Sequence, residues 1–209
     1  MTRIVVIGGG GHAKVLISLL KKLEWEILGY TDPSDRGAIL GAPYLGPDET
    51  LASTREAHGR CCAFLGVGKT DAAATRRQVR DSLVIPGSDW PVIVSPQAVV
   101  NEQVVLSEGT VVMDGAVVNS GTVTDAICIL NTNCTVDHDC RLGENVHVAP
   151  GATLSGGVTV GQDTMIGAGA TVIQGLTVCP GCLVGAGATV IADIAIPGVY
   201  VGSPARRIG

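Results

Sequence analysis

The sequence predicts a small α/β domain followed by a parallel β-helix. A glycine-rich turn between an apolar run and a helical pattern indicates the first, and a six-residue repeat of aliphatic residues from Val94 onward indicates the second. The composition agrees, since 29 residues are Gly and only 3% are aromatic. A core of small aliphatic side chains suits a tightly wound coil better than an ordinary globule. We assign residues 1–88 to the first domain and 89–209 to the second.

Short apolar runs alternate with helical patterns in the first domain, which is typical of a parallel α/β unit. A turn-rich segment at 31–49 separates the second predicted strand from the third. The predicted strands are 4–7, 26–30 and 61–67, and the predicted helices are 13–23 and 70–83. Two prolines and a glycine make 85–91 a predicted linker.

The first strand runs into a glycine-rich turn. Gly8-x-Gly10-x-x-Ala13 opens the first helix, and Asp32 follows the second strand about twenty residues later, as in dinucleotide-binding domains. In such turns the amides at the helix N-terminus face phosphates. The domain has too few strands for a complete dinucleotide-binding fold, so we interpret it as a half-Rossmann-like unit; a purely structural turn is the alternative. Lys69, after the third strand, would suit a diphosphate or is a solvated residue at a helix start.

Every sixth residue from Val94 to Val190 is Val, Leu or Ile, with Thr124 as the one exception. The residue four places later is mostly small, as at Ala98 and Cys128. A six-residue period with one aliphatic and one small inward residue is typical of a short strand followed by a corner. Three such hexads close one triangular coil. The seventeen hexads therefore predict between five and six stacked coils. We expect Gly and Asn at the corners because they tolerate a positive φ.

Two of the four histidines, His138 and His147, lie in the repeat. His138 takes an outward position in its hexad, between Asp137 and Asp139. A carboxylate orients an imidazole and raises its basicity, so His138 with one of these neighbours is a candidate general base for acyl transfer from a thioester. A nearby backbone amide, such as that of Gly156, could bind the oxyanion. Alternatively, both histidines only form hydrogen bonds at a subunit interface.

Four features resemble a known family when they are taken in order. They are Val6-Ile7-Gly8-Gly9-Gly10-Gly11-His12, the hexapeptide repeat, Asn131 ahead of Val136-Asp137-His138-Asp139-Cys140, and the ending Val201-Gly202-Ser203-Pro204-Ala205-Arg206-Arg207. Together they closely resemble the sialic acid O-acetyltransferase and nucleotide-sugar N-acetyltransferase family, which includes bacillosamine-pathway and perosamine N-acetyltransferases. The resemblance covers nearly the whole chain. It implies a left-handed β-helix, a homotrimer, acetyl-CoA as co-substrate, no metal, and a nucleotide-linked amino sugar, of the 4-amino-4,6-dideoxy type, as acceptor.

The resemblance also implies roles for individual residues. His138 matches the catalytic base and Asp139 the carboxylate that enhances its basicity, although some relatives have Glu at the second position. Asn131 matches a residue that shapes the acceptor site. The positions implied to contact or line acetyl-CoA are His147, Gly156, Ala168 and Ala186. Those implied to contact the nucleotide sugar are Gly10, Gly11, His12, Asp32, Gly68, Lys69 and Arg76. Arg206 and Arg207 could also meet the phosphates of CoA.

Other functions remain open at this point. An O-acetyltransferase acting on sialic acid would use the same base and coenzyme groove, and a sugar-nucleotide-binding scaffold would not need His138. A zinc carbonic anhydrase built on a β-helix would need three histidines around its metal, whereas the repeat contains two. A monomeric β-helix with flat outer faces would carry regular Thr ladders, which we do not expect here.

Charge, hydropathy and cysteine usage exclude further classes. A net charge of −5 without a cluster of Lys or Arg provides no basic field for nucleic acid. No stretch approaches the ~20 apolar residues of a membrane span. Seven Cys without an export signal predict reduced thiols in the cytoplasm.

The cysteines themselves are expected to be structural. Cys179 and Cys182 have CxxC spacing, but their positions in the hexad predict that the first points outward and the second inward. We therefore expect the two to diverge and to form no metal or redox site. Cys128, Cys134 and Cys140 share the small inward position and are predicted core residues.

Overall fold

The computed structural model describes residues 2–73, 75–83, 85–86 and 89–208. Its contacts divide the chain into two compact units, Met1–Gly68 with Arg76–Pro91, and Lys69–Thr75 with Val92–Gly209. Gly87 and Ser88, which belong to the predicted linker and to the predicted domain boundary, lie outside the described residues, as does Ala74 of the predicted second helix. The segment that follows the third predicted strand thus packs with the second unit.

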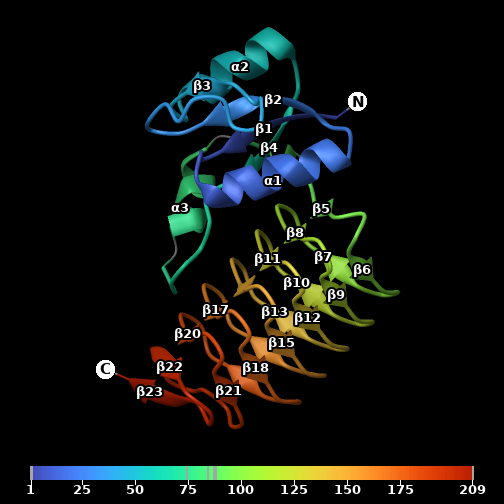
Figure 1. Ribbon diagram of the computed structural model, residues 1–209, viewed down its shortest axis with the longest axis vertical. Helices are drawn as coiled ribbons and strands as arrows, with labels where there is room; N and C mark the ends of the chain where they lie inside the picture. The colour runs from blue at the N-terminus through green and yellow to red at the C-terminus, as the bar shows by residue number, and fades with distance from the viewer. Residues whose placement is uncertain (1, 74, 84, 87–88, 209) are drawn as a thin grey trace. The chain divides into compact units, whose positions relative to one another are not determined.

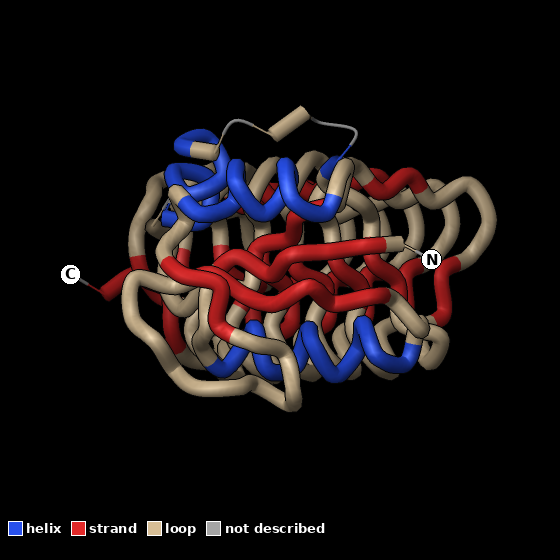
Figure 2. The backbone as a smooth tube through the Cα atoms, turned by 90° about the horizontal axis from the view of Figure 1, so that it is seen from above, coloured by secondary structure: helices blue, strands red, loops and turns tan. Residues whose placement is uncertain are grey.

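The first unit is a parallel four-stranded sheet with the strand order β3-β2-β1-β4. The strands are β1 (Arg3–Ile7), β2 (Glu26–Thr31), β3 (Tyr44–Gly46) and β4 (Cys62–Leu65), and the helices are α1 (Gly11–Lys22), α2 (Thr50–His58) and α3 (Thr75–Ser82). The connections β1-α1-β2 and β3-α2-β4 run in opposite directions along the sheet, so right-handed crossovers place their helices on opposite faces. Figure 2 shows helices on both sides of the strands. Ile4 to Ile7 are fully buried between them.

The predicted half-Rossmann-like architecture is confirmed, with three local differences. The second predicted helix begins only at Thr75, because the Asp71 side chain accepts a hydrogen bond from the N–H of Ala73 and holds a turn there. Strand β3 was missed, since three residues are too few to display alternation. Helix α2 was missed because Leu51 is its one buried residue, so it has no apolar stripe.

The second unit is a left-handed parallel β-helix, as predicted. Two-residue strands recur every six residues, and each pairs with the strand eighteen residues away, as Thr135 does with Thr153. Figure 1 shows the resulting stack of coils. The strands are β5 (Ile93–Val94), β6 (Val99–Val100), β7 (Val105–Leu106), β8 (Val111–Val112), β9 (Val117–Val118), β10 (Val123–Thr124), β11 (Ile129–Leu130), β12 (Thr135–Val136), β13 (Arg141–Leu142), β14 (His147–Val148), β15 (Thr153–Leu154), β16 (Thr159–Val160), β17 (Met165–Ile166), β18 (Thr171–Val172), β19 (Thr177–Val178), β20 (Leu183–Val184), β21 (Thr189–Val190), β22 (Val199–Val201) and β23 (Arg206–Ile208).

Three sheets form the walls of the coil. They are a five-stranded sheet (β19-β16-β13-β10-β7), a six-stranded sheet (β21-β18-β15-β12-β9-β6) and an eight-stranded sheet (β23-β22-β20-β17-β14-β11-β8-β5). The last two strands of the chain, β22 and β23, pair antiparallel at the end of the eight-stranded sheet. There Arg206 and Arg207 are exposed.

The predicted inward residues form the core. From Val112 to Val190, no aliphatic position of the hexad is more than 2% exposed, and the small residues Cys128, Cys134 and Cys140 are fully buried. One expectation about the outer faces is wrong. Thr135, Thr153, Thr171 and Thr189 lie opposite one another on successive coils of the six-stranded sheet, which is a regular Thr ladder.

The corners follow one backbone rule. Every sixth residue from Gln103 to Gly187 has a positive φ, between 55° and 76°. Most of these residues are Gly, and Asn133, Asp139 and Asn145 are among the others. Asn and Asp are the non-glycine residues that best tolerate this conformation. The coil geometry therefore favours the corner glycines and asparagines predicted from the sequence, although Gln103 and Ile127 adopt the same conformation.

The predicted divergence of Cys179 and Cys182 is wrong. Their Sγ atoms lie 3.4 Å apart. The inward–outward rule describes residues within a strand, whereas these two cysteines begin and end a corner. Among the residues that the structure describes, no group of three or more His, Cys, Asp or Glu side chains could hold a metal ion. No described helix has the length and apolar character needed to cross a membrane.

Candidate functional site

His138 and Asp139 form a hydrogen-bonded pair on the corner between β12 and β13. His138 Nδ1 and Asp139 Oδ2 are 2.8 Å apart, and the two side chains are 61% and 73% exposed. Asp139 has a φ of 59°, and this left-handed conformation turns its carboxylate back onto the preceding ring. The hydrogen bond to Asp139, together with the charge of Asp137, raises the pKa of His138 despite a small opposing effect of burial.

Two glycines on neighbouring coils leave room for this pair. A Cβ atom at Gly121 would lie 2.5 Å from Oδ1 of Asp139, and a Cβ atom at Gly156 would overlap Nε2 of His138. The coils are in register here, since Gly157 donates its N–H to the carbonyl of His138 at 2.8 Å. The imidazole therefore lies against the backbone of Gly156, and its Nε2 points away from Asp139.

Asp137 holds the backbone of the same turn. Its Oδ1 accepts hydrogen bonds from the N–H of His138 at 2.8 Å and from Nδ2 of Asn119 at 2.7 Å. Asn119 in turn accepts from Nδ2 of Asn101 at 2.7 Å, so a polar ladder crosses three coils and ends at His138. The hydrogen bonds from Asn119 and His138 lower the pKa of Asp137. Asp137 therefore fixes the main chain, and Asp139 orients the ring.

The hydroxyl of Thr122 closes the turn from inside the coil. It donates to the carbonyl of Asp137 at 2.7 Å and accepts from the N–H of Cys140 at 3.1 Å. Thr122 is fully buried. Thus a side chain from the preceding coil joins the two ends of the turn that carries His138.

His147 and Asn131 meet on the eight-stranded sheet side. Nδ2 of Asn131 donates to Nε2 of His147 at 3.0 Å, and Nδ1 of His147 donates to the carbonyl of Lys69 at 2.8 Å. The amide orientation is fixed because Oδ1 of Asn131 accepts from the N–H of Thr132. Since Nδ2 of Asn131 can only donate and the carbonyl of Lys69 can only accept, Nε2 of His147 acts as the acceptor and Nδ1 as the donor. His147 is 6% exposed.

The ammonium group of Lys69 is not exposed to solvent. Its Nζ donates to the carbonyl of Ala73 at 2.7 Å, and the residue is 5% exposed. Its carbonyl, as described above, receives the hydrogen bond of His147. Lys69 thus links the 69–73 segment to the β-helix through its backbone.

The expected coenzyme positions are divided between two edges of the β-helix. The His138 edge consists of the turns 119–122, 137–140 and 155–158, and it includes Gly156. The Ala168 edge consists of the turns 131–134, 149–152, 167–170 and 185–188. Ala168 and Ala186 are exposed on successive coils of this edge, where Ala168 accepts a hydrogen bond from Gly187 at 2.9 Å. One chain therefore does not bring His138 together with Ala168 and Ala186.

In the first unit, the expected nucleotide-contacting residues gather where three neighbouring strands end. The glycine turn follows β1, Asp32 follows β2, and Gly68 lies just beyond β4. Gly8 bonds to the end of β2, and Gly66 bonds to the end of β1. Carboxyl ends of parallel strands are the usual ligand edge of such sheets. Gly68 lies close to His12, since a Cβ atom there would be 3.3 Å from that of the histidine.

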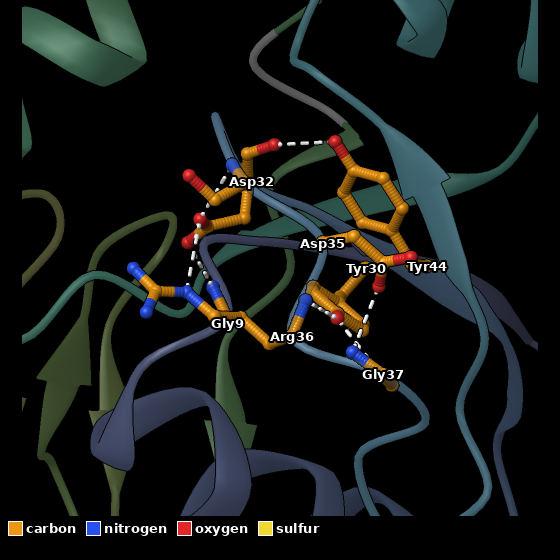
Figure 3. Close-up of polar contacts among 8 residues, drawn as sticks. Gly9, Tyr30, Asp32, Asp35, Arg36, Gly37 and Tyr44 are labelled. Carbon is orange, nitrogen blue, oxygen red and sulfur yellow. Dashed lines mark hydrogen bonds and ion pairs between the residues drawn. The ribbon is translucent and has the colours of Figure 1, made fainter.

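Asp32 organises the glycine turn (Figure 3). Its Oδ2 accepts the N–H of Gly9 at 2.9 Å, and its Oδ1 accepts the N–H of Ser34 and lies 3.4 Å from Nε of Arg36. Although burial opposes ionisation, the amides of Gly9 and Ser34 and the Arg36 guanidinium together lower the pKa of Asp32. Gly10 and Gly11, at the N-terminus of α1, are exposed and have open space around them.

Arg36 was missed in the sequence, and Arg76 was misassigned. Arg36 is an exposed cation beside Asp32, and a side chain at Gly9 would collide with Tyr30 and crowd Arg36. In the sequence, only its position four residues after Asp32 indicates that Arg36 could lie beside that carboxylate. Arg76, an expected substrate contact, is 1% exposed and donates to the carbonyls of Leu65 and Val67. It caps the end of β4 and supports the loop that contains Gly68, so its guanidinium does not face a ligand.

Comparison with known proteins identifies relatives of both units. Residues 3–83 match the model of the PglD N-terminal domain. The acetyltransferase domain of PglB from Neisseria gonorrhoeae FA1090 is 35% identical, with a TM-score of 0.91 and all of both chains covered. That domain has also been solved in complex with acetyl coenzyme A. A search of curated protein sequences gave no match.

Two further solved structures are similar over the whole chain. PerB from Caulobacter crescentus, in complex with CoA and GDP-perosamine, is 35% identical, with a TM-score of 0.88 and coverage of 100% of this chain and 98% of that one. WeeI from Acinetobacter baumannii AYE is 23% identical, with a TM-score of 0.84 and all of both chains covered. At that identity the last similarity concerns the fold alone.

Proposed function

Because the chain belongs to the hexapeptide-repeat acyltransferases that carry a PglD N-terminal domain, we propose that it acetylates the amino group of a nucleotide-linked amino sugar with acetyl-CoA. The relatives solved with acetyl coenzyme A and with CoA and GDP-perosamine support both substrates. The observation that carries the proposal is the His138–Asp139 pair, whose Nε2 lies against Gly156. A sugar of the 4-amino-4,6-dideoxy type is the acceptor we favour.

His138 serves as the general base in this proposal. Asp139 accepts a hydrogen bond from the N–H at Nδ1 of His138, which leaves the lone pair of Nε2 available to the acceptor amine. When the sugar amine attacks the thioester carbonyl, Nε2 takes the proton that the amine loses, and the Asp139 carboxylate stabilises the resulting imidazolium. The N–H of Gly156 donates to the oxyanion. His138 then returns the proton to the departing thiolate of CoA.

We further propose that the active site forms between subunits of a homotrimer. His138 and Gly156 occupy one edge of the β-helix, whereas Ala168 and Ala186 occupy another, and His147 lies beside the second. A single site that uses both sets needs the His138 edge of one chain beside the Ala168 edge of its neighbour. Closed cyclic symmetry satisfies this requirement for every subunit at once.

Subunit complementation tests this arrangement. His138→Ala removes the base, and Ala186→Trp blocks the other edge with a bulky side chain on an exposed corner. Each variant alone should be inactive. Co-expression of the two differently tagged chains should restore activity, because some interfaces then combine an intact base with an intact groove. Absence of recovery in purified mixed trimers would place both sets within one chain and overturn the proposal.

The first unit is proposed to bind the nucleotide diphosphate. The open amides of Gly10 and Gly11 at the N-terminus of α1 suit phosphate oxygens, because the helix dipole and the N–H groups both favour an anion there. His12 and Gly68 lie beside this turn, and Arg36 adds a positive charge. Asp32 lies at the same edge of the sheet. Its Oδ2 accepts a hydrogen bond from the N–H of Gly9, so Asp32 also stabilises the glycine turn.

The main alternative is O-acetylation of a sialic acid, which the same base would catalyse. A thiol-release assay with acetyl-CoA separates the possibilities. The acceptors are UDP-, GDP- and dTDP-linked 4-amino sugars and free sialic acid. We expect CoA release with at least one amino-sugar nucleotide; release with sialic acid alone would favour the O-acetyltransferase. Release with none of them, despite binding of a sugar nucleotide, would favour a scaffold. A cytoplasmic location stays a prediction.

A further inference from the structure

Cys179 and Cys182 are the two ends of one tight turn between β19 and β20. Pro180 and Gly181 occupy its centre, and Gly181 has a φ of 70°. Proline followed by a residue with positive φ is the pattern of a type II turn, which brings its first and fourth residues together. The Sγ atoms are 3.4 Å apart, within hydrogen-bond distance for thiols, and they are not joined by a disulfide.

Contacts with Thr164, Ile194 and Gly161 hold the turn in place. The hydroxyl of Thr164 donates to the carbonyl of Cys179 at 3.1 Å and accepts from the N–H of Cys182 at 3.2 Å. The N–H of Cys179 donates to the carbonyl of Ile194 at 2.8 Å. On the preceding coil, Gly161 packs so closely that a Cβ atom there would overlap Pro180. The proximity of the sulfurs is therefore built into the fold.

We propose that Cys179 and Cys182 are a modification site, a dithiol that low-molecular-weight disulfides oxidise to an intrachain disulfide. Formation of the bond needs a small side-chain rotation, because the backbone already presents the two sulfurs to each other. The site is independent of the acyl-transfer chemistry, and it lies on neither the His138 edge nor the Ala168 edge.

The order of steps follows from burial. Cys179 is partly exposed and Cys182 is fully buried, so the sulfur of Cys179 attacks the incoming disulfide. A mixed disulfide forms, and one thiolate of the oxidant leaves. Sγ of Cys182 then attacks Sγ of Cys179, the second thiolate leaves, and the Sγ–Sγ bond closes. The two cysteines lose two protons and two electrons, and the oxidant becomes two thiols.

The pKa of Cys182 agrees with attack by Cys179 first and by Cys182 second. Burial, together with the hydrogen bond and charge of Cys179, raises the pKa of Cys182 to about 12. Cys182 alone is therefore a poor nucleophile. Once Cys179 is in a mixed disulfide it carries no charge, so part of the cause that suppresses ionisation of Cys182 disappears. The second step thus becomes easier only after the first has occurred.

The remaining cysteines are not arranged for this reaction. Cys128, Cys134 and Cys140 are fully buried on successive corners, which lie on different edges of the coil. Cys61 and Cys62 are adjacent in the chain at the start of β4, where successive side chains point to opposite faces. Oxidation by a small disulfide should consequently select the pair at 179 and 182.

Thiol counting after oxidation tests the proposal on the intact protein. The folded chain is incubated with glutathione disulfide, denatured, alkylated and weighed by mass spectrometry. We expect five of the seven cysteines to be alkylated, without bound glutathione, and all seven after treatment with dithiothreitol. Alkylation of all seven after oxidation would overturn the proposal.

Variants locate the bond. Cys182→Ala retains the fold, because Ala occupies the same hexad position at Ala170 and Ala188, and it should keep a mixed disulfide with glutathione on Cys179. Cys179→Ser should take up no glutathione at the turn and form no internal bond. Cys62→Ser is the matched control and should still lose two thiols on oxidation. An internal disulfide that persists in Cys182→Ala would contradict the assignment.

Discussion

Thr122 and Thr164 make the same bridge in two turns of the β-helix, and the turn bridged by Thr122 carries His138. Each hydroxyl donates to the carbonyl at the start of the turn on the next coil and accepts from the N–H at its end. Other corners close without a side chain, as where the N–H of Cys134 donates directly to Asn131 at 3.0 Å. The inserted hydroxyl therefore sets the width of the turn that holds the base.

Thr122→Val should reduce kcat by about tenfold, the effect of losing one positioning hydrogen bond, with an unchanged KM for acetyl-CoA. Thr164→Val is the matched control, because it removes the same bridge from a turn without a proposed catalytic role. Both variants should lose about 1 kcal/mol of stability in denaturant unfolding, and Thr122→Ser should restore activity. Equal activities of the two valine variants would show that the bridge is only structural.

The raised pKa of His138 should be visible in the pH dependence of kcat/KM. A general base works only when it is unprotonated, and the hydrogen bond to Asp139 raises the pKa of His138 above its ordinary value of about 6.5. Activity should therefore rise as the pH increases through that raised pKa. In Asp139→Asn the pKa falls, so the acidic limb of the profile should move to lower pH while the plateau also drops. An acidic limb that stays in place would exclude this role for Asp139.

Gly156→Ala should separate activity from stability. The added Cβ atom overlaps Nε2 of His138, and the exposed end of that side chain can rotate away at little cost to the fold. We expect the melting temperature to change by no more than about 2 °C, with kcat reduced at least tenfold. Retention of wild-type kcat would mean that Nε2 does not need its position against Gly156.

Asp32→Asn should affect the nucleotide sugar alone. Replacement of the carboxylate weakens the acceptor for the Gly9 amide and removes the charge beside Arg36. The KM for the nucleotide sugar should rise by about tenfold, the value of one charge-assisted hydrogen bond, and the KM for acetyl-CoA should not change. Steady-state kinetics with each substrate varied in turn will show whether the effect is confined to the first unit.

The β-helix was predictable because its hexad is a local pattern. An aliphatic residue recurs at nearly every sixth position, and this can be read from a single sequence. Val112 and Val190 are inward for the same reason, and corner residues such as Asn133 needed only the rule about positive φ. Helix α2 escaped detection because a helix with one buried residue has no periodic signal.

The surroundings of His138 were less predictable because they come from other coils. Asn119, Gly121 and Thr122 lie about one coil before the turn that they support, and adding eighteen residues to each position would have aligned them with Asp137, Asp139 and Cys140. The proximity of Cys179 and Cys182 was not predictable from the hexad, since inward and outward alternation holds within strands and these residues bound the corner between β19 and β20. Arg76 illustrates a third limit, because its burial depends on tertiary packing.

Whether His138 is the general base is tested by the release of CoA by wild-type protein and by His138→Ala, measured with the amino-sugar nucleotide that the acceptor panel identifies. Acetyl-CoA binding and trimer mass are determined for both proteins, so that loss of a substrate or of assembly is recognised. We expect a decrease in kcat of about 10²–10⁴-fold, typical of a lost general base, with acetyl-CoA binding and trimer mass unchanged. A His138→Ala protein that turns over at the wild-type rate would contradict it.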